Sequence, residues 1–286
     1  KKPDAQLLAA LLTKADVFIQ NLKPGAVGKL GFGIDRLRRD HSRLICCSIS
    51  GYGDTGPYKD RKAYDLLIQA ESGLSSVTGG PEAPARVGVS VVDIATGMNA
   101  YEAILEALIA RGMTGQGADI RVSMFDAMAE WMSVPLLQAE GGKPPKRIGF
   151  AHTSVAPYGV FATRDGTPIL ISIQNEREWA VFAERILKQP DMISDVKFAT
   201  NVARCAHREV LDTIVADVFC DREVAALAVD LDAADIAFGR VNETADLMRH
   251  PHLRRVMIGS PAGPIGVPAP ASVTDGHASA FGPVPA

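Results

Sequence analysis

Leu44-Ile-Cys-Cys-Ser-Ile-Ser50 is a run of apolar and small residues without regular polar alternation. That pattern is typical of a strand whose two faces are both covered, as in a parallel sheet between layers of helices. Further strand-like runs occur at residues 17–19, 86–92 and 118–122, and segments with helical periodicity separate them. The alternation predicts an α/β fold, in which a parallel sheet carries helices on both faces.

The helices predicted around these strands cover residues 5–14, 64–74, 94–111 and 124–138. The clearest is 94–111, because its large apolar side chains recur on one helical face: Met98, Tyr101, Ile104, Leu105, Leu108 and Ile109. We expect residues 1–138 to form a large α/β domain.

A smaller α+β domain is predicted for residues 151–240, after a linker at 139–150 that contains Gly141-Gly-Lys-Pro-Pro145. Its first element is expected to be a hairpin that turns at Asp165-Gly166. Helices are expected to follow at 176–188, 207–219 and 221–230. Residues 241–286, which are rich in Pro and Gly from Pro261 on, are expected to form an extended segment.

Bulk composition excludes several classes of protein. The chain has 286 residues, 47% of them hydrophobic, and a formal net charge of −3, so a nucleic-acid-binding surface is not expected. No run of 18 apolar residues is present, so no membrane span is expected. Four cysteines in a chain of this length do not form a disulfide framework, which favours a reducing compartment, the cytoplasm.

Asp93 follows the β-branched run Arg86-Val-Gly-Val-Ser-Val-Val92, where the longest predicted helix begins. An aspartate at this position is commonly the N-cap of a helix. The positive end of the helix dipole also favours the ionised, nucleophilic carboxylate. The local pattern alone favours the N-cap and leaves the catalytic interpretation open.

Two other patterns are weaker. Gly51-Tyr-Gly-Asp-Thr-Gly56 matches the dinucleotide-binding motif, but Pro57 follows where a helix should begin, so a nicotinamide site is not favoured. The six histidines include the pair His250 and His252 but no further ligands at suitable spacing. No metal site is therefore predicted.

Several segments in order resemble the family III CoA-transferases, the formyl-CoA transferase-like group. The segments are Ala15-Asp-Val-Phe-Ile-Gln-Asn-Leu-Lys-Pro-Gly25, Leu30-Gly-Phe-Gly33, Ser50-Gly-Tyr-Gly-Asp-Thr-Gly-Pro57, Ala63-Tyr-Asp-Leu-Leu-Ile-Gln-Ala-Glu-Ser-Gly73, Thr78-Gly79, the Asp93 segment, Thr114-Gly-Gln-Gly117 and Val122-Ser-Met-Phe-Asp126. The resemblance extends over the first 130 residues or so and rests on the order and spacing of these segments rather than on any one of them.

The resemblance implies transfer of coenzyme A from an acyl-CoA donor to a small carboxylic acid. Asp93 matches the family nucleophile, which carries the acyl and CoA intermediates. Lys23, Lys62 and Tyr64 match positions that contact CoA, and Asp65 matches an acidic position close to the nucleophile. CoA enters as a substrate, and no permanently bound cofactor is implied. Family members form interlocked homodimers, so the same assembly is expected here. In the family the segment that matches residues 241–286 returns to the large domain, and the same return is expected here.

The second half of the chain gives weaker expectations about the substrate. Many family members have a glycine-rich loop after the hairpin of the small domain, where this chain has Ile173-Gln-Asn-Glu-Arg-Glu-Trp179. That substitution resembles mesaconyl- and itaconyl-CoA transferases, and it suggests Gln174 or Asn175 as polar donors. His152 is a candidate near the substrate. Arg86 or Arg147 is a candidate for the distal carboxylate of a C4–C5 dicarboxylate.

The resemblance also implies an internal fragment, since family members usually continue beyond both ends of this chain. Two alternatives therefore remain. A CoA-thioester racemase of the same superfamily would need a histidine base where this chain has Tyr64. A fragment that binds CoA without turnover would show no exchange between a labelled carboxylate and its acyl-CoA.

Overall fold

The computed structural model describes residues 2–275 and 282–283. The chain divides into two compact units, residues 1–153 and 154–286. Residues 139–150, which we predicted as a linker, belong to the first unit. The division into a large domain, a linker, a small domain and a return segment stays a prediction.

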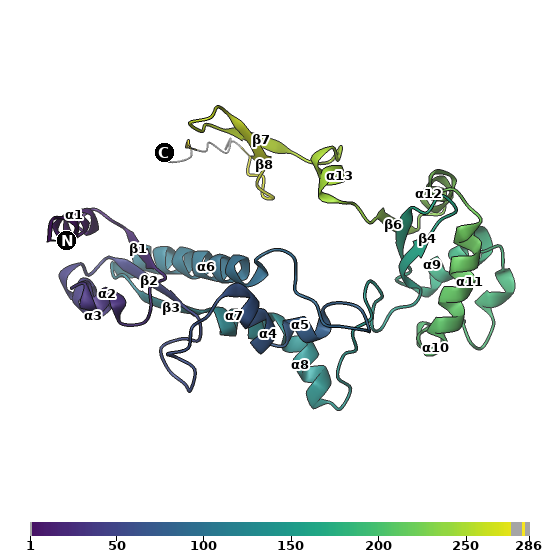
Figure 1. The fold of residues 1–286 in the computed structure, drawn as a ribbon, viewed down its shortest axis with the longest axis horizontal. Coiled ribbons are helices and arrows are strands. Elements are labelled where there is room, and N and C mark those ends of the chain that lie inside the picture. Colours follow the sequence, from purple (N-terminus) through teal and green to yellow (C-terminus); the bar gives the residue numbers. More distant parts are fainter. Residues whose placement is uncertain (1, 276–281, 284–286) are drawn as a thin grey trace. The chain divides into compact units, whose positions relative to one another are not determined.

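The first unit contains a parallel sheet in the order β1-β2-β3, which confirms the predicted α/β fold (Figure 1). Val17 pairs with Ile45, and Cys46 pairs with Asp119. The elements of this unit are α1 (Lys2–Leu12), β1 (Val17–Gln20), α2 (Ala26–Lys29), α3 (Ile34–Asp40), β2 (Ile45–Ser50), α4 (Asp65–Glu71), α5 (Leu74–Val77), α6 (Val91–Thr114), β3 (Asp119–Ser123), α7 (Met124–Trp131) and α8 (Ser133–Glu140).

The adjacent cysteines of β2 show why this strand lacks alternation. Successive side chains of a strand point to opposite faces of the sheet. Cys46 packs with Leu12 and Leu37, from α1 and α3, whereas Cys47 packs with Ala100 and Ile104 of α6. Both faces are covered, so both thiols are fully buried, and burial raises the pKa of Cys46 to about 11.

The strand predicted at residues 86–92 is wrong. Residues 83–90 have no regular secondary structure, and Val91 and Val92 form the first turn of α6. β-Branched residues favour strands only weakly, and tertiary contacts override that preference. Here the backbone N–H of Val87 donates to Gln69, and that of Val92 donates to Asp65, so neither pairs with a strand.

The predicted helix at 124–138 is interrupted, with α7 ending at Trp131 and α8 beginning at Ser133. Pro135 lies in the first turn of α8, where a missing N–H is tolerated. In one continuous helix residue 135 would donate its N–H to the Trp131 carbonyl, which a proline cannot do. The predicted apolar face of α6 is also divided. Ala100 and Ile104 are buried, whereas the other large side chains are mostly exposed: Met98, Tyr101, Leu105 and Ile109.

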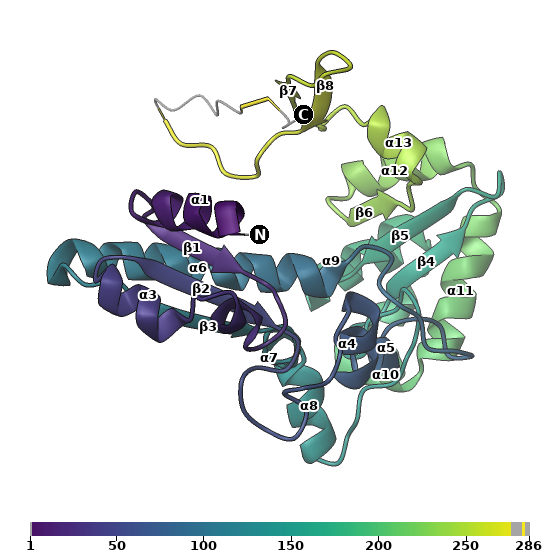
Figure 2. The ribbon, with the colours of Figure 1, turned by 60° about the vertical axis from the view of Figure 1, so that its left-hand side comes forward.

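The second unit has its own antiparallel sheet, in the order β4-β5-β6 (Figure 2). Its core centres on Ile169 and Ile171 of the sheet, packed with Trp179, Phe182 and Phe219 from the helices. The elements are β4 (Tyr158–Ala162), β5 (Pro168–Ser172), α9 (Glu176–Val181), the π-helix η1 (Phe182–Ile186), the 3-10 helix η2 (Pro190–Ile193), α10 (Asn201–Ala206), α11 (Arg208–Cys220), α12 (Val224–Ala233), β6 (Ala237–Arg240), α13 (Thr244–Met248), β7 (Arg255–Ile258) and β8 (Ile265–Pro268).

The predicted hairpin at Asp165-Gly166 is confirmed, since β4 and β5 pair and Gly166 adopts a φ of 76° in the turn. The C-terminal segment is less extended than we predicted, because β7 and β8 form a second antiparallel hairpin. Residues 276–281 and 284–286 of that segment lie outside the described residues.

Candidate functional site

A cavity of about 810 Å³ lies at the carboxyl ends of β1 and β2 in the first unit. Parallel strands end at the same edge of a sheet, and ligands of open α/β sheets bind outside that edge. The loops after the two strands, residues 59–64 and the first turns of α6 enclose it. The lining residues are Asn21, Leu22, Lys23, Pro24, Ile49, Ser50, Gly51, Lys59, Asp60, Arg61, Lys62, Ala63, Tyr64, Asp93, Thr96, Gly97 and Met124.

Asp93 reaches this cavity from the first turn of α6 and is exposed. It is the third residue of the helix, so the N-cap interpretation is wrong. Ser90 is the N-cap and, within the described residues, makes no side-chain cap hydrogen bond. The cap is supplied instead by Asp65, whose Oδ2 accepts from the backbone N–H of Val92 at 2.8 Å and of Asp93 at 3.3 Å.

The first amides of α6 are therefore already paired. The N–H of Val91 donates to Val89 O at 2.8 Å, and that of Ile94 donates to Ser90 O at 3.0 Å. With Val92 and Asp93 bound to Asp65, the first-turn amides have acceptors within the protein. An oxyanion formed beside Asp93 would need donors from elsewhere, such as side chains that line the cavity.

The surroundings of the Asp93 carboxylate raise its pKa. Neighbouring protein atoms partly withdraw the group from water, which is the larger cause, and the negative charge of Asp65 adds to it. Both effects disfavour the ionised form. A carboxylate with a raised pKa keeps more basicity and hence more nucleophilicity when it is ionised.

Four cationic side chains line the same cavity, Lys23, Lys59, Arg61 and Lys62. Arg61 is tied into the protein, with its guanidinium 3.7 Å from the ring centre of Tyr58 and 3.7 Å from a carboxylate oxygen of Glu71. In the part of the chain that the structure describes, the three lysines have no ion-pair partner. They are mobile point charges of the kind that suits a phosphate or diphosphate group.

Lys59, Asp60 and Arg61 are cavity residues that the sequence analysis missed, as are Asn21 and Ser50. The sequence does contain a pattern that could have identified Lys59, Asp60 and Arg61. Lys59-Asp-Arg-Lys62 is a cluster of charges close after the strand that ends at Ser50, where a parallel sheet places its binding residues. Tyr64 also lines the cavity, with 68% of its surface exposed.

The arginines predicted to hold a distal carboxylate have other partners. Arg147 donates to three backbone carbonyls, Gly80 O at 3.2 Å, Ser76 O at 3.1 Å and Pro81 O at 3.4 Å. Arg86 donates to Val87 O and Gly88 O of its own loop. Both side chains thus fix loops. His152 does not line the cavity either.

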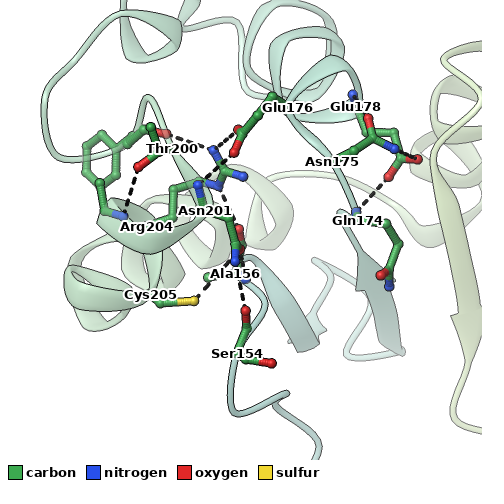
Figure 3. A network of polar contacts seen from close by, with 12 residues as sticks. Ser154, Ala156, Gln174, Asn175, Glu176, Glu178, Thr200, Asn201, Arg204 and Cys205 are labelled. Atoms are coloured by element: carbon green, nitrogen blue, oxygen red, sulfur yellow. Dashed lines mark hydrogen bonds and ion pairs between the residues drawn. The ribbon is translucent and has the colours of Figure 1, made fainter.

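Gln174 and Asn175 lie in the second unit, at the start of α9 (Figure 3). Asn175 is the N-cap, accepting from the Glu178 N–H at 2.9 Å and donating to Glu178 Oε1 at 2.6 Å. Gln174 donates through its backbone to Glu178 Oε2 at 2.7 Å and through its side chain to Ser172. The side-chain NH₂ group of each residue thus already has an acceptor within the segment.

A fully buried arginine anchors the same segment (Figure 3). Arg204 donates to Glu176 Oε2 at 2.7 Å, to Ala156 O at 2.7 Å and to Phe198 O at 2.9 Å. Its guanidinium lies over the Trp179 ring, 4.8 Å from the ring centre. The start of α9, the chain at Ala156 and helix α10 are therefore joined at one side chain.

The geometry after β2 does not suit a nicotinamide cofactor. Residues 51–64 form turns and bends rather than a helix, so the Gly51–Gly56 motif lacks the helix N-terminus that binds a pyrophosphate. A Cβ on Gly51 would lie 2.1 Å from the Ala63 side chain, so this glycine is needed for packing. Over the described residues, no set of three or more His, Cys, Asp or Glu could hold a metal ion. The helices described there are also too short or too polar to span a bilayer.

Comparison with known proteins gives one consistent family. The model of CoA-transferase family III matches residues 1–271. The succinyl-CoA:glutarate CoA-transferase of Mus musculus is 34% identical over 273 residues, covering 93% of this chain and 62% of that protein. The succinyl-CoA:mesaconate CoA-transferase of Haloarcula hispanica is 30% identical over 256 residues, covering 87% of this chain and 63% of that protein.

Among solved structures, a CAIB/BAIF family protein from Brucella suis is 32% identical and superposes with a TM-score of 0.80. That alignment covers 96% of this chain and 73% of the other. The chain spans less than two thirds of the length of the two curated relatives above.

Proposed function

Because the chain belongs to CoA-transferase family III, we propose that the protein transfers coenzyme A from an acyl-CoA donor to a carboxylic acid. The observation that carries the proposal is the cavity at the carboxyl ends of β1 and β2. It places the Asp93 carboxylate in one space with Lys23, Lys59 and Lys62, which have no ion-pair partner in the described part of the chain. A carboxylate nucleophile and cations for phosphates are what this reaction needs.

The chemistry is covalent catalysis by carboxylate. Asp93 attacks the thioester carbonyl of the donor, which breaks the C–S bond, releases CoA thiolate and forms a mixed anhydride. The thiolate then attacks the aspartyl carbonyl of the anhydride, which gives an aspartyl-CoA thioester and frees the donor acid. The acceptor carboxylate attacks that thioester, and the steps run in reverse until Asp93 is a carboxylate again. The proposal needs no permanently bound cofactor.

Several residues in and beside the cavity have roles in the proposal. Lys23 and Lys62 bind the phosphate groups of CoA, and Lys59 lies where it can add to them. Tyr64 lies beside the thiol-bearing arm of CoA. Asp65 caps α6 and keeps the Asp93 backbone in place. A racemase is less well supported, because no histidine lines the cavity in the described part of the chain.

For the substrate we propose a C4–C5 dicarboxylate. Relatives over most of this chain are named for succinyl-CoA with glutarate or mesaconate. Arg86 and Arg147 would have to leave their backbone partners to bind a distal carboxylate. A cation of the cavity is therefore a better candidate for that contact.

We also propose a homodimer located in the cytoplasm. The exposed apolar side chains of α6 support the assembly, because Met98, Tyr101 and Ile109 are each more than 60% exposed. An apolar row of this kind is usually covered by another surface. The unpaired cysteines support a reducing compartment. A monodisperse monomer in sedimentation at micromolar concentrations would contradict the dimer.

The function is tested by isotope exchange with the protein at its full natural length. Labelled succinate, glutarate and mesaconate are each incubated with their unlabelled acyl-CoA, and the label in acyl-CoA is followed with time. We expect Asp93-dependent exchange with at least one pair. CoA binding without exchange across the panel would leave a CoA-binding protein and overturn the transferase.

A further inference from the structure

Gln69 is a fully buried polar side chain on α4, and it is not one of the residues that line the cavity. Its Nε2 donates to Asp65 Oδ1 at 2.6 Å, and its Oε1 accepts from the backbone N–H of Val87 at 2.9 Å. Burial of an amide is costly unless both ends are paired. Here both ends are paired, and the two partners lie on segments 22 residues apart in the sequence.

The orientation of the Gln69 amide is fixed by its neighbours. The N–H of Val87 is a donor, so the amide oxygen must face it and the NH₂ group must face Asp65. That contact occupies Oδ1 of Asp65 and leaves Oδ2 toward α6. A carboxylate can accept at both oxygens at once, so the three residues form one continuous set of hydrogen bonds.

The set ends at the backbone of Asp93. Asp65 Oδ2 accepts from the N–H of Val92 at 2.8 Å and from that of Asp93 at 3.3 Å. The N-cap Ser90 makes no side-chain cap bond, and residues 83–90 have no regular structure. Gln69 and Asp65 therefore tie both the loop before α6 and the start of α6 to α4.

The charges around Asp93 make the placement of Asp65 important. In addition to the effect of burial, the carboxylate of Asp65, on α4, acts electrostatically on the Asp93 side chain and raises its pKa. From the loops the Asp93 side chain shares the cavity with Lys23, Lys59, Arg61 and Lys62, and with Asp60. A neutral amide holds Asp65 in place without adding another charge to this balance. An ionised glutamate at position 69 would keep the Val87 contact, lose the donor to Asp65 and add a second negative charge.

We propose that Gln69 is a positioning residue for Asp93, acting through Asp65 and the Val87 backbone to set the place of the nucleophile at the start of α6. The inference rests on the proposed function, in which Asp93 attacks the thioester. No contact of Gln69 with acyl-CoA is involved. Misplacement of a reacting group by about 1 Å can cost on the order of 100-fold in rate.

The test uses Gln69→Met and Gln69→Glu in the protein at its full natural length. Methionine fills a similar volume and removes both hydrogen bonds, whereas glutamate retains the acceptor for Val87. We expect both to lower kcat by about 10- to 100-fold, with KM for acyl-CoA changed less than about twofold because no binding contact is lost. In Gln69→Met, Asp65 loses the donor that holds it near Asp93, so less of its charge acts on Asp93 and the acid limb of kcat/KM should move to lower pH. In Gln69→Glu, an ionised side chain adds a negative charge, so the acid limb should move to higher pH.

Ile45→Val is the matched control, since it removes one buried methyl group of the same unit away from Asp65. It should lower stability and leave kcat per folded molecule unchanged. If Gln69→Met behaves in the same way, with an unchanged pH profile, the residue is structural and the proposal is overturned.

A second readout separates this inference from the proposed function. Carboxyl-¹³C aspartate labelling gives the titration of Asp93 by NMR, with Asp93→Asn to identify the signal. Failure of the wild-type protein to exchange label would refute the transferase, but the Asp93 titration would still be expected to move to lower pH in Gln69→Met. An unmoved titration would refute the positioning role even in an active enzyme.

Discussion

The backbone N–H of Asp93 donates to the carboxylate of Asp65 over 3.3 Å, so one acidic residue caps the helix that carries the other. The same carboxylate contributes to the raised pKa of the Asp93 side chain, after the partial burial of that group. Capping and electrostatics therefore come from one residue, 28 positions earlier in the chain. The consequence is that the role of Asp93 can be separated from the stability of α6.

Asp93→Asn should abolish exchange and leave the fold intact. An amide cannot form the anhydride, whereas the cap of α6 is supplied by Asp65 and is retained. The helix N-terminus favours the Asp93 charge by about 0.3–1 kcal/mol, but partial burial and the charge of Asp65 outweigh that gain, since the pKa is raised. The variant should therefore be at least as stable as the wild type near neutral pH. Exchange assays and urea unfolding check both statements. A normally active Asp93→Asn protein would remove Asp93 from the mechanism.

The raised pKa of Asp93 fixes the direction of the pH dependence. The nucleophile must be ionised, so kcat/KM should fall with decreasing pH through a midpoint above the ordinary aspartate value of 3.8. The free energy of unfolding depends on pH in the opposite direction to kcat/KM. An acid with a raised pKa in the folded state costs nothing below its unfolded pKa and destabilises the fold as pH rises through the folded pKa. Asp93→Asn should remove that part of the pH dependence of unfolding.

Asp65→Asn should move the acid limb of kcat/KM to lower pH, because the charge that disfavours ionised Asp93 is removed. The variant should also lower kcat, since one amide oxygen cannot accept from both Gln69 and the start of α6 as two carboxylate oxygens do. Glu82→Gln, a change in an exposed acid outside the cavity, serves as control. An unmoved acid limb in Asp65→Asn would show that the two carboxyl groups are uncoupled.

The two exposed lysines with a proposed phosphate contact should affect binding rather than chemistry. Lys23→Ala or Lys62→Ala should each raise KM for acyl-CoA about fivefold, equivalent to about 1 kcal/mol, with kcat nearly unchanged. The effect should shrink at high salt, which screens exposed charges. Lys29→Ala, an exposed lysine outside the cavity, is the matched control. Equal KM values for all three variants would place the phosphates elsewhere.

The first unit shows what local sequence can and cannot predict. Runs of apolar residues located β1, β2 and β3 to within a residue or two, because a strand covered on both faces needs such a run. Val91 and Val92 were wrongly predicted as strand residues. They begin a helix because Asp65, which is distant in the sequence, accepts a hydrogen bond from the Val92 N–H. Periodicity likewise identified α6 but not the division of its apolar residues into buried and exposed faces.

The candidate site was predicted with similar limits. Family resemblance gave Lys23, Lys62, Tyr64, Asp65 and Asp93. All except Asp65 line one cavity, and Asp65 instead caps the helix that carries Asp93. It gave the residues but no contacts. That Arg147 is already bound to three carbonyls, or that Asn175 caps α9, follows only from the arrangement of loops in space.

The second unit gives a stability prediction at Arg204. Because this side chain is fully buried and donates to Glu176 and two backbone carbonyls, Arg204→Met should leave the carbonyls of Ala156 and Phe198 without a donor. Each such loss costs about 1–3 kcal/mol, so we expect about 3 kcal/mol in urea unfolding. A loss below about 1 kcal/mol would mean that the buried guanidinium adds little to stability.

Glu176 adds a pH dependence to that prediction. Burial works to raise the pKa of its carboxyl, but the hydrogen bonds from Arg204 and the Asn201 backbone, with the charge of Arg204, lower it overall. A lowered folded-state pKa gives stability that is present above the ordinary glutamate value of 4.5 and is lost as pH falls through the folded value. Glu176→Gln should therefore have a smaller free energy of unfolding than the wild type at neutral pH. The difference between the two proteins should narrow as the pH falls below 4.5. Glu184→Gln, an exposed position in η1, should show no such narrowing. A constant difference across the acid range would show that the Glu176 carboxylate is not coupled to folding through Arg204.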